Sequence, residues 1–572
     1  MTFKIRTLSA SFLAGAALLL SACGSDGPSA PTDLPPINAV ASSFSATSAR
    51  ITWYRVADAT SYVVQRAVGA TGGTFTTISP AGLTDTVYVD TGIEPSTTYR
   101  YRIQAIRATG PSQYTSEVSA VTPAPGGSSG TINANITANR TLYADTAYKL
   151  SGFIQVTNGA TLTIQPGTKI FGDFDVTGSS LFITRGAKID AQGTAANPIV
   201  FTSSRPAGQR QPGDWGGIIM IGSGIVNKTG TITIEGTGNG ANNPAQVYSG
   251  GADNADNSGI LRYVRVEFAG YATATNQELN SFTFAALGSG TRLEYLQTLA
   301  GLDDSYEWFG GAVDGKYLVS YESGDDHFDI SEGYVGRLQY LIAMQTRIIP
   351  PRAAAGSPSS DPQGIENDGC DGAGCTNGQN STPLTVPVVA NFTLFGTGTA
   401  NGVTLPANGG RGMMLRRGTG GFYVNGVIGR FPSAAISFRD TTTFQRQTEG
   451  VFSLQNILMV ENGNVFDPQV FTSGTISSVR QYTADTTANN LRTAAGTASA
   501  QFTSVISAQP ANGATFDWSP VAGSAAASGG LATFTGALQT RAGTVVTGTA
   551  FRGAADPTGA KWWQGWTTYA IN

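Results

Sequence analysis

Two acidic segments hold the densest group of residues in this chain that could do chemistry. Each segment contains three acids, and every acid of the first recurs 22 positions later in the second: Asp303, Asp304, Glu307, Asp325, Asp326 and Asp329. If 22 residues make one turn of a repeating structure, the paired acids lie about 4.8 Å apart on neighbouring strands. Six carboxylates so close together would repel and raise one another's pKa unless they are neutralised.

Three kinds of chemistry fit this pattern. A calcium ion takes six to eight oxygen ligands and could bind between the repeats. Alternatively, the aspartates cap turn amides and form a structural ladder. In the third interpretation, paired carboxylates act as general acid and base on a glycosidic bond. The only histidine, His327, follows Asp326 directly and is expected to be a surface or hydrogen-bonded residue.

Short strands that recur about every 20 residues must position these acids. Residues 162–170 align with residues 181–189 at an offset of 19, and four tyrosines recur at steps of 32, 22 and 23: Tyr263, Tyr295, Tyr317 and Tyr340. Such periods, with glycine at the corners, are typical of a parallel β-solenoid, in which each coil is buried against its neighbours. The 32-residue step predicts an inserted loop at 271–279. A longer loop is predicted at 348–384, which is rich in Pro, Gly and Ser.

Residues 37–123 are predicted to form a separate unit of short alternating strands, such as 50–53 and 99–105. The early Trp53, the late Tyr-x-Tyr-x-Ile strand and the closing segment 116–123 resemble a fibronectin type III domain. This resemblance implies a seven-stranded β-sandwich, with Trp53 in its core. Residues 124–130 are predicted to be a flexible linker, and the solenoid is expected to occupy 131–572.

Four stretches of the large domain resemble a poorly characterised family of exported right-handed β-helix proteins, common among bacterial lipoproteins: residues 213–219, 257–271, 307–311 and 563–567. The resemblance implies an all-β protein, a sandwich followed by a parallel β-helix, but it implies no activity. The Asp-Asp pairs are also similar to those of polygalacturonases. The Gly-His-Gly motif of those enzymes is absent here.

The first 22 residues have the layout of a secretory signal, with Lys4 and Arg6 before an apolar run too short to span a bilayer. The following Leu-Ser-Ala-Cys resembles the bacterial lipobox. This resemblance implies that Cys23 is the lipidated first residue of the mature chain, followed by a polar tether over 23–36. Gly24 then implies sorting to the outer membrane, so we expect an exported, lipid-anchored protein exposed at the cell surface.

Composition excludes several classes of protein. Charged residues are only 13% of the chain and the net charge is −4 without a basic cluster, which argues against nucleic-acid binding. One histidine and three cysteines exclude most metal sites built from these residues. In an oxidising envelope Cys370 and Cys375 are expected to form a disulfide, and a free thiol pair is the alternative.

The leading functional hypothesis is a non-catalytic surface lipoprotein whose β-helix binds a glycan, matrix or a partner such as an outer-membrane protein. The alternative is a lyase or hydrolase acting on acidic polysaccharides. The incomplete catalytic signature speaks against an enzyme, as does the lack of a basic residue near the acids other than Lys316. Arg411, Arg416 and Arg417 are expected at a solvated corner.

Overall fold

A computed structural model describes residues 34–45, 47–122, 128–240, 242–359, 362–398, 408–467, 489–502 and 516–570. The predicted signal peptide and Cys23 lie outside these described residues. The chain divides into two compact units, residues 1–124 and 125–572. Within the described ranges, none of the helices has the length and apolar character needed to cross a bilayer.

The first unit is a β-sandwich of two antiparallel sheets, as expected of a fibronectin type III-like domain. Its core contains Trp53, which packs edge-on against Tyr62 with ring centroids 5.3 Å apart, together with the buried Ile51 and Tyr101. Trp53 is therefore a core residue. One sheet holds β1 (Val40–Ser45), β2 (Ser48–Thr52) and β5 (Val87–Thr91); the other holds β3 (Ala59–Val68), β4 (Thr76–Thr77), β6 (Thr98–Arg107), β7 (Gly110–Tyr114) and β8 (Val118–Val121).

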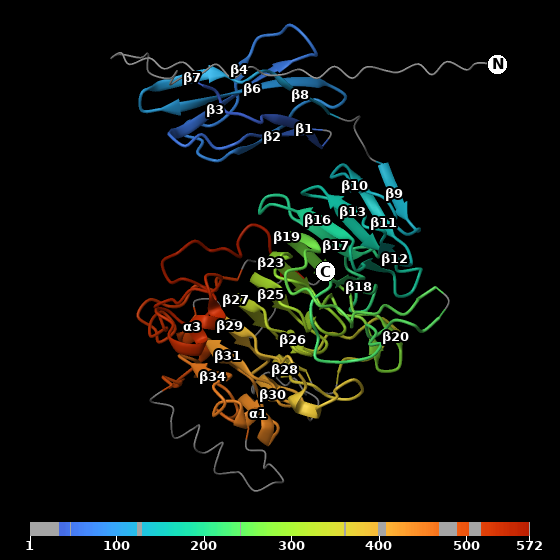
Figure 1. The fold of residues 1–572 in the computed structure, drawn as a ribbon, viewed down its shortest axis with the longest axis vertical. Coiled ribbons are helices and arrows are strands. Elements are labelled where there is room, and N and C mark those ends of the chain that lie inside the picture. Colours follow the sequence, from blue (N-terminus) through green and yellow to red (C-terminus); the bar gives the residue numbers. More distant parts are fainter. Residues whose placement is uncertain are drawn as a thin grey trace, which may run out of the picture. The chain divides into compact units, whose positions relative to one another are not determined.

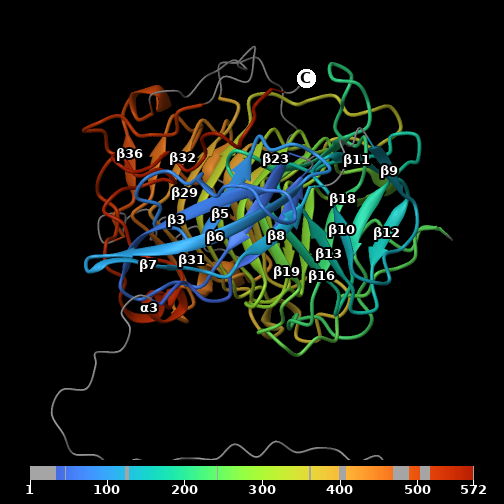
Figure 2. The same ribbon diagram turned by 90° about the horizontal axis from the view of Figure 1, so that it is seen from above.

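The second unit is a parallel β-helix, whose strands stack in chain order (Figures 1 and 2). Its 17-stranded sheet contains β9 (Ser128–Ile132), β10 (Arg140–Leu142), β11 (Thr146–Leu150), β13 (Thr161–Ile164), β14 (Lys169–Gly172), β16 (Lys188–Gln192), β17 (Ile199–Ser203), β19 (Gly259–Glu267), β23 (Arg292–Leu299), β25 (Asp314–Tyr321), β27 (Arg337–Met344), β29 (Val388–Phe395), β31 (Gly421–Val424), β32 (Val427–Gly429), β34 (Phe452–Gln455), β35 (Leu458–Val460) and β36 (Arg492–Ala494). Its 9-stranded sheet contains β12 (Phe153–Val156), β15 (Ser180–Ile183), β18 (Gly217–Ile221), β22 (Phe282–Ala285), β24 (Tyr306–Phe309), β26 (Phe328–Ser331), β28 (Gln363–Asp368), β30 (Arg411–Arg416) and β33 (Ala434–Phe438).

The larger sheet is bent and supplies two faces of the helix. Strand β16 pairs with the first part of β19, from Gly259, whereas β17 pairs with its second part, from Val264. The bend between these parts falls at Tyr263, whose φ of 50° lies in the left-handed region. The 9-stranded sheet closes the third face, so each central coil has two strand segments in the bent sheet and one in the other.

A ladder of left-handed residues follows this bend through the stack. Tyrosines occupy it at φ of 50°, 55°, 63° and 65°, and asparagines continue it at 53°, 58°, 54° and 51°: Tyr263, Tyr295, Tyr317, Tyr340, Asn391, Asn425, Asn456 and Asn490. The tyrosine rings stack with centroids 4.3, 4.4 and 5.0 Å apart, which confirms the predicted steps as coil register. Stacking worth about 0.5–1.5 kcal/mol per pair offsets part of the backbone strain.

The 19-residue repeat does not relate successive coils. Leu162 pairs with Ile189, 27 positions later, whereas Leu181 lies in β15 of the other sheet and pairs with Ile154. The prediction was wrong because strands on different faces bury the same alternating apolar side chains in one core. Sequence likeness alone therefore does not reveal which face a strand occupies.

Two of the predicted insertions differ in their outcome. The loop predicted at 271–279 is confirmed as an antiparallel hairpin of β20 (Ala272–Ala274) and β21 (Gln277–Glu278).

The loop predicted at 348–384 is interrupted by β28, which adds a strand between β26 and β30. Its sequence, Gln-Gly-Ile-Glu-Asn-Asp, has no apolar alternation, because Glu366 and Asp368 face the site described below while the polar Asn367 is buried and donates to the hydroxyl of Tyr423. The same segment holds 3₁₀-helix η1 (Gly378–Asn380) and the predicted disulfide between Cys370 and Cys375, which is confirmed. At the start of the solenoid, β9 begins at Ser128, within the residues predicted as a linker.

The C-terminal residues 516–570 pack along the bent sheet. Trp566 meets Tyr263 edge-on at 5.6 Å, and Trp562 contacts Tyr317 at 5.2 Å. Side-chain amides of Gln297 and Gln339 donate hydrogen bonds to backbone carbonyls of this segment. The C-terminal tryptophans therefore cover half-buried tyrosines of coils in the middle of the stack. The remaining helical elements are α1 (Thr441–Gln445), η2 (Ala498–Ala500) and α3 (Gly536–Ala542).

Replacing one ring of the tyrosine ladder tests its contribution. We expect Tyr295→Ala to lower the free energy of unfolding by about 2–4 kcal/mol, because it removes two stacking partners and opens a cavity. Tyr143→Ala is the matched control, since 46% of Tyr143 is exposed, and it should change stability by less than about 0.5 kcal/mol. Denaturant unfolding of residues 24–572 measures both. Equal effects of the two substitutions would contradict a stabilising ladder.

Candidate functional site

The acidic segments meet on the outer face of the 9-stranded sheet. Glu307 of β24 lies opposite Asp329 of β26, which confirms the predicted 22-residue register. Tyr306 and Phe328 stack beneath them with ring centroids 5.3 Å apart. The row continues to Glu366 of β28, which lies opposite Asp329. Sequence reasoning missed Glu366 because this coil is 37 residues long, and the spacing that revealed the other acids is lost.

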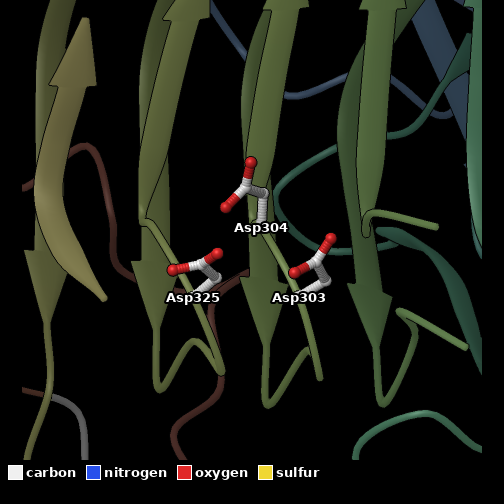
Figure 3. Close-up of side chains that lie close together, drawn as sticks. All are labelled: Asp303, Asp304 and Asp325. Atoms are coloured by element: carbon white, nitrogen blue, oxygen red, sulfur yellow. The ribbon is translucent and has the colours of Figure 1, made fainter. Parts of the chain in front are cut away.

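The four remaining acids lie in the turns that lead into β24 and β26. Figure 3 shows Asp303 and Asp325 projecting from neighbouring turns, with Asp304 close to both. These turns stack tightly: a Cβ on Gly324 would lie 1.8 Å from the carbonyl oxygen of Leu302. Asp304 accepts a hydrogen bond of 2.9 Å from the amide of Asp326, and Asp326 accepts one from the amide of Gln363. These two side chains therefore also link successive turns.

The acids line a groove of about 500 Å³ whose other wall comes from inserted segments. The loop between β18 and β19 supplies Lys228 and Glu235, and the β20–β21 hairpin supplies Glu278. In all, twelve carboxylates and three cationic side chains line the groove: Glu235, Glu278, Asp303, Asp304, Glu307, Asp325, Asp326, Asp329, Glu332, Glu366, Asp368, Asp371, Lys228, Arg416 and Arg417. Half of these acids lay outside the predicted set: Glu235 and Glu278 belong to insertions, and Glu366 and Asp368 lie on β28, which the 22-residue spacing does not reach.

The cationic side chains neutralise one end of the groove. Arg416 pairs with Glu366 and Asp368, and Arg417 pairs with Asp368 and Asp371. This corrects the expectation of a solvated corner for these two arginines. The cross-strand register places Arg416 directly opposite Asp368, so the pair forms where the strands meet.

Three further basic residues are placed by the structure. Lys228 approaches Glu332 to 2.6 Å and enters the groove from a loop that gave no sequence signal. Arg411 is 5% exposed and pairs with Asp467, so it too departs from the expected solvated corner. Lys316 lies on β25 of the bent sheet and does not line the groove.

Five of the predicted acids form no ion pair within the described part of the chain: Asp303, Asp304, Glu307, Asp326 and Asp329. Burial raises the pKa of each of them well above its ordinary value, and neighbouring carboxylates raise it further. Burial likewise raises the pKa of Glu235 to about 7, with added repulsion from Glu278 and Asp325. The groove therefore holds more carboxyl groups than its cationic side chains can pair, and without a bound cation these acids keep their protons to a higher pH than ordinary carboxyl groups.

The arrangement of oxygens suits a divalent cation. Three overlapping triads bring carboxylate oxygens within 4.8 Å of one another, and Asp304 and Asp329 each belong to two triads: Asp303, Asp304 and Asp325; Asp304, Glu307 and Asp329; and Asp326, Asp329 and Glu366. Oδ1 of Asp329 is buried and has no hydrogen-bond partner in the described structure. An all-oxygen donor set fits hard cations such as Ca²⁺ or Mg²⁺.

His327 and four tryptophans of the β-helix unit are buried. His327 is 2% exposed, and its Nδ1 lies 2.5 Å from the hydroxyl of Ser320. Burial lowers the pKa of His327 to about 3, so the ring is neutral at physiological pH. Trp215, Trp308, Trp563 and Trp566 are at most 1% exposed and offer no face to a ligand.

The fold and the groove together define a protein of the parallel β-helix class with an elongated, oxygen-lined site on its 9-stranded sheet. The chain belongs to the family described as the pectate-lyase-like β-helix domain, whose model matches residues 134–507. No curated protein matches the chain.

The solved structures that resemble the chain include several fibronectin type III domains. A Fn3-like protein from Clostridium thermocellum is 30% identical, with 16% of this chain and 94% of that chain covered and a TM-score of 0.15. The fn3 domain of human collagen alpha-1(XX) is 24% identical over 18% of this chain and 96% of its own, with a TM-score of 0.16. The FN5 domain of Drosophila Lar is 18% identical over 16% of this chain and 100% of its own, with a TM-score of 0.14.

The buried acids give the cation-free protein an unusual pH dependence. An acid whose pKa is raised on folding contributes stability below its unfolded pKa of about 4, and this stability is lost as the pH rises through the folded pKa. We therefore expect the melting temperature in EGTA to fall as the pH rises from about 4 to beyond 7, the value reached by Glu235. Scanning calorimetry across this range measures the change. The double variant Asp303→Asn/Asp325→Asn should show a flatter profile, and a melting temperature that rises with pH in the parent would refute this assignment.

Proposed function

We propose that this protein is an exported polysaccharide-binding protein that holds its glycan through calcium bound in the acidic groove. The observation that carries the proposal is the group of five carboxylates that form no ion pair within the described part of the chain: Asp303, Asp304, Glu307, Asp326 and Asp329. Membership of the pectate-lyase-like β-helix family supports a polysaccharide-related role. An elongated groove along a stack of coils suits an extended chain, since successive coils offer similar contacts at a regular spacing.

The residues of the three triads would hold the calcium. Bound there, calcium supplies positive charge that offsets the repulsion between these carboxylates and offers coordination positions to anionic sugar oxygens. Asp304 and Asp326 hold successive turns in register by accepting backbone hydrogen bonds. At the other end of the groove, Arg416 pairs with Glu366 and Asp368, and Arg417 pairs with Asp368.

Catalysis on an acidic polysaccharide, by elimination or hydrolysis, is the second candidate function. It is favoured by the three cationic side chains in the groove and by the pKa of Glu235, which burial raises to about 7, close to the value that suits a proton-transferring group. Against it, all three cations are engaged in ion pairs with carboxylates of the same groove. Binding is therefore the preferred function.

Calcium titration of residues 24–572 tests the binding site. Saturating calcium, at about 100 times its Kd, should add about 2.7 kcal/mol to the stability of the parent protein. The double variant Asp303→Asn/Asp325→Asn should lose most of this gain, because it removes two carboxylates of one triad. Asp175→Asn is the matched control, since Asp175 is an exposed acid outside the groove. An equal calcium response in all three proteins would rule out the groove as the site.

The same preparation distinguishes binding from catalysis. With calcium present, a binding protein retains an acidic polysaccharide at its original length. Elimination instead yields unsaturated ends that absorb in the ultraviolet, and hydrolysis yields new reducing ends without that absorbance. Either product would replace the binding proposal by the second candidate.

We further propose that Cys23 anchors the mature protein in the outer membrane, with the sandwich acting as a spacer for the β-helix, which binds glycan or a partner protein. In the native bacterium the parent should partition into the detergent phase and incorporate labelled fatty acid. Cys23→Ser should appear in the aqueous phase without label, because thioether attachment of the lipid requires the thiol. Detergent partitioning of the Cys23→Ser protein would argue against this anchor.

A further inference from the structure

The acidic groove continues into a second compartment of different chemistry. A hollow of about 770 Å³ lies between the β20–β21 hairpin and residues 354–359. It shares Glu278, Asp303, Asp325 and Ser359 with the acidic groove, so the two hollows adjoin at these residues, and we call them together the channel. We call the second hollow the hairpin compartment.

The lining of the hairpin compartment is almost uncharged. Among the described residues that line it, the carboxylates are the three at the shared boundary, and none is a lysine or an arginine. The remaining residues offer hydroxyls, an amide or small apolar groups: Tyr271, Ala272, Thr273, Ala274, Thr275, Asn276, Ala354, Gly356, Ser357, Pro358 and Ser359. Hydroxyl and amide groups both donate and accept hydrogen bonds, as the hydroxyls of an uncharged sugar require.

Tyr271 gives the compartment a fixed aromatic wall. Its amide donates to the carbonyl of Trp215 at 3.2 Å, and its carbonyl accepts from the amide of Leu279 at 3.1 Å. The guanidinium of Arg352 lies 5.5 Å from the centre of its ring. The half-buried ring is therefore held in place at the base of the hairpin, where it can pack against the apolar face of a sugar.

We propose that the channel recognises a mixed glycan, with an anionic sugar over the carboxylate triads and uncharged sugars directly beside it in the hairpin compartment. This inference rests on the proposed function, because calcium must hold the anionic sugar. An anionic sugar in the hairpin compartment would meet Glu278, Asp303 and Asp325 at its boundary, whereas none of the described lining residues is basic and the guanidinium of Arg352 already packs on the ring of Tyr271. A polymer made only of anionic sugars therefore loses affinity in this part of the channel through like-charge repulsion.

Calorimetry with three oligosaccharides of equal length tests the inference on residues 24–572 in saturating calcium. The probes are an all-uronate chain, a chain alternating uronate with a neutral hexose, and an all-neutral chain. We expect the alternating chain to bind about tenfold more tightly than the all-uronate chain, and the all-neutral chain to bind most weakly. All-uronate binding equal to or tighter than that of the alternating chain would overturn the inference.

A charge introduced into the hairpin compartment provides an independent test. Thr275 is exposed in the hairpin turn, so Thr275→Lys should fold normally and supply the missing cation. It should bring the preference for the alternating chain from about tenfold to about twofold, by strengthening all-uronate binding. Thr177→Lys, on an exposed loop that lines neither compartment, should leave the preference unchanged. An unchanged preference in Thr275→Lys would count against the compartment.

Calcium isotherms without glycan separate failure of this inference from failure of the proposed function. If calcium does not bind, the proposed function fails and this inference with it. If calcium binds and neither anionic probe binds, calcium-dependent glycan recognition is refuted as a whole. If both anionic probes bind equally well, the proposed function stands and the mixed-glycan inference alone is refuted.

Discussion

In-register parallel stacking of the coils is the constraint on which the rest of this structure depends. Because each residue pairs with the residue at the same position of the next coil, like side chains fall on like side chains. The consequence depends on the side chain. Stacked rings of Tyr263, Tyr295 and Tyr317 attract one another and support a strained bend. Stacked acids such as Glu307 and Asp329 repel one another, and the same register creates an electrostatic problem that a cation can resolve.

Departures from a constant coil length turn this stack into a binding surface. The loop between β18 and β19, the β20–β21 hairpin and the segments around β28 leave the stack and build walls around the row of acids. The coils therefore supply the regular array of carboxylates together with Arg416, while the insertions supply Lys228, Glu235 and the uncharged compartment. A β-helix can keep its core and alter its ligand by changing insertions alone, since the core residues face inward on every coil.

The tyrosine ladder on the bent sheet and the row of acids on the 9-stranded sheet differ in whether another segment covers them. The C-terminal segment covers the tyrosine ladder, and Trp562 and Trp566 pack on its rings. The carboxylate ladder stays accessible in a groove. The stacked tyrosines are therefore covered and do not form a sugar-binding surface, whereas Tyr271 lines the hairpin compartment.

The sequence by itself determined the repeating architecture, the β-sandwich, the disulfide and the pairing of Glu307 with Asp329. These features depend on periodicities and short spacings that can be measured directly along the sequence. It did not determine which face each strand occupies, so residues 162–170 and 181–189 were aligned as successive coils although they lie on different faces. Only the tertiary structure brought Lys228, Glu235, Glu366 and Arg416 to the acids. Their separation from the acids along the chain depends on insertions whose lengths follow no rule. Only the folded stack of coils shows that these residues lie close to the acids.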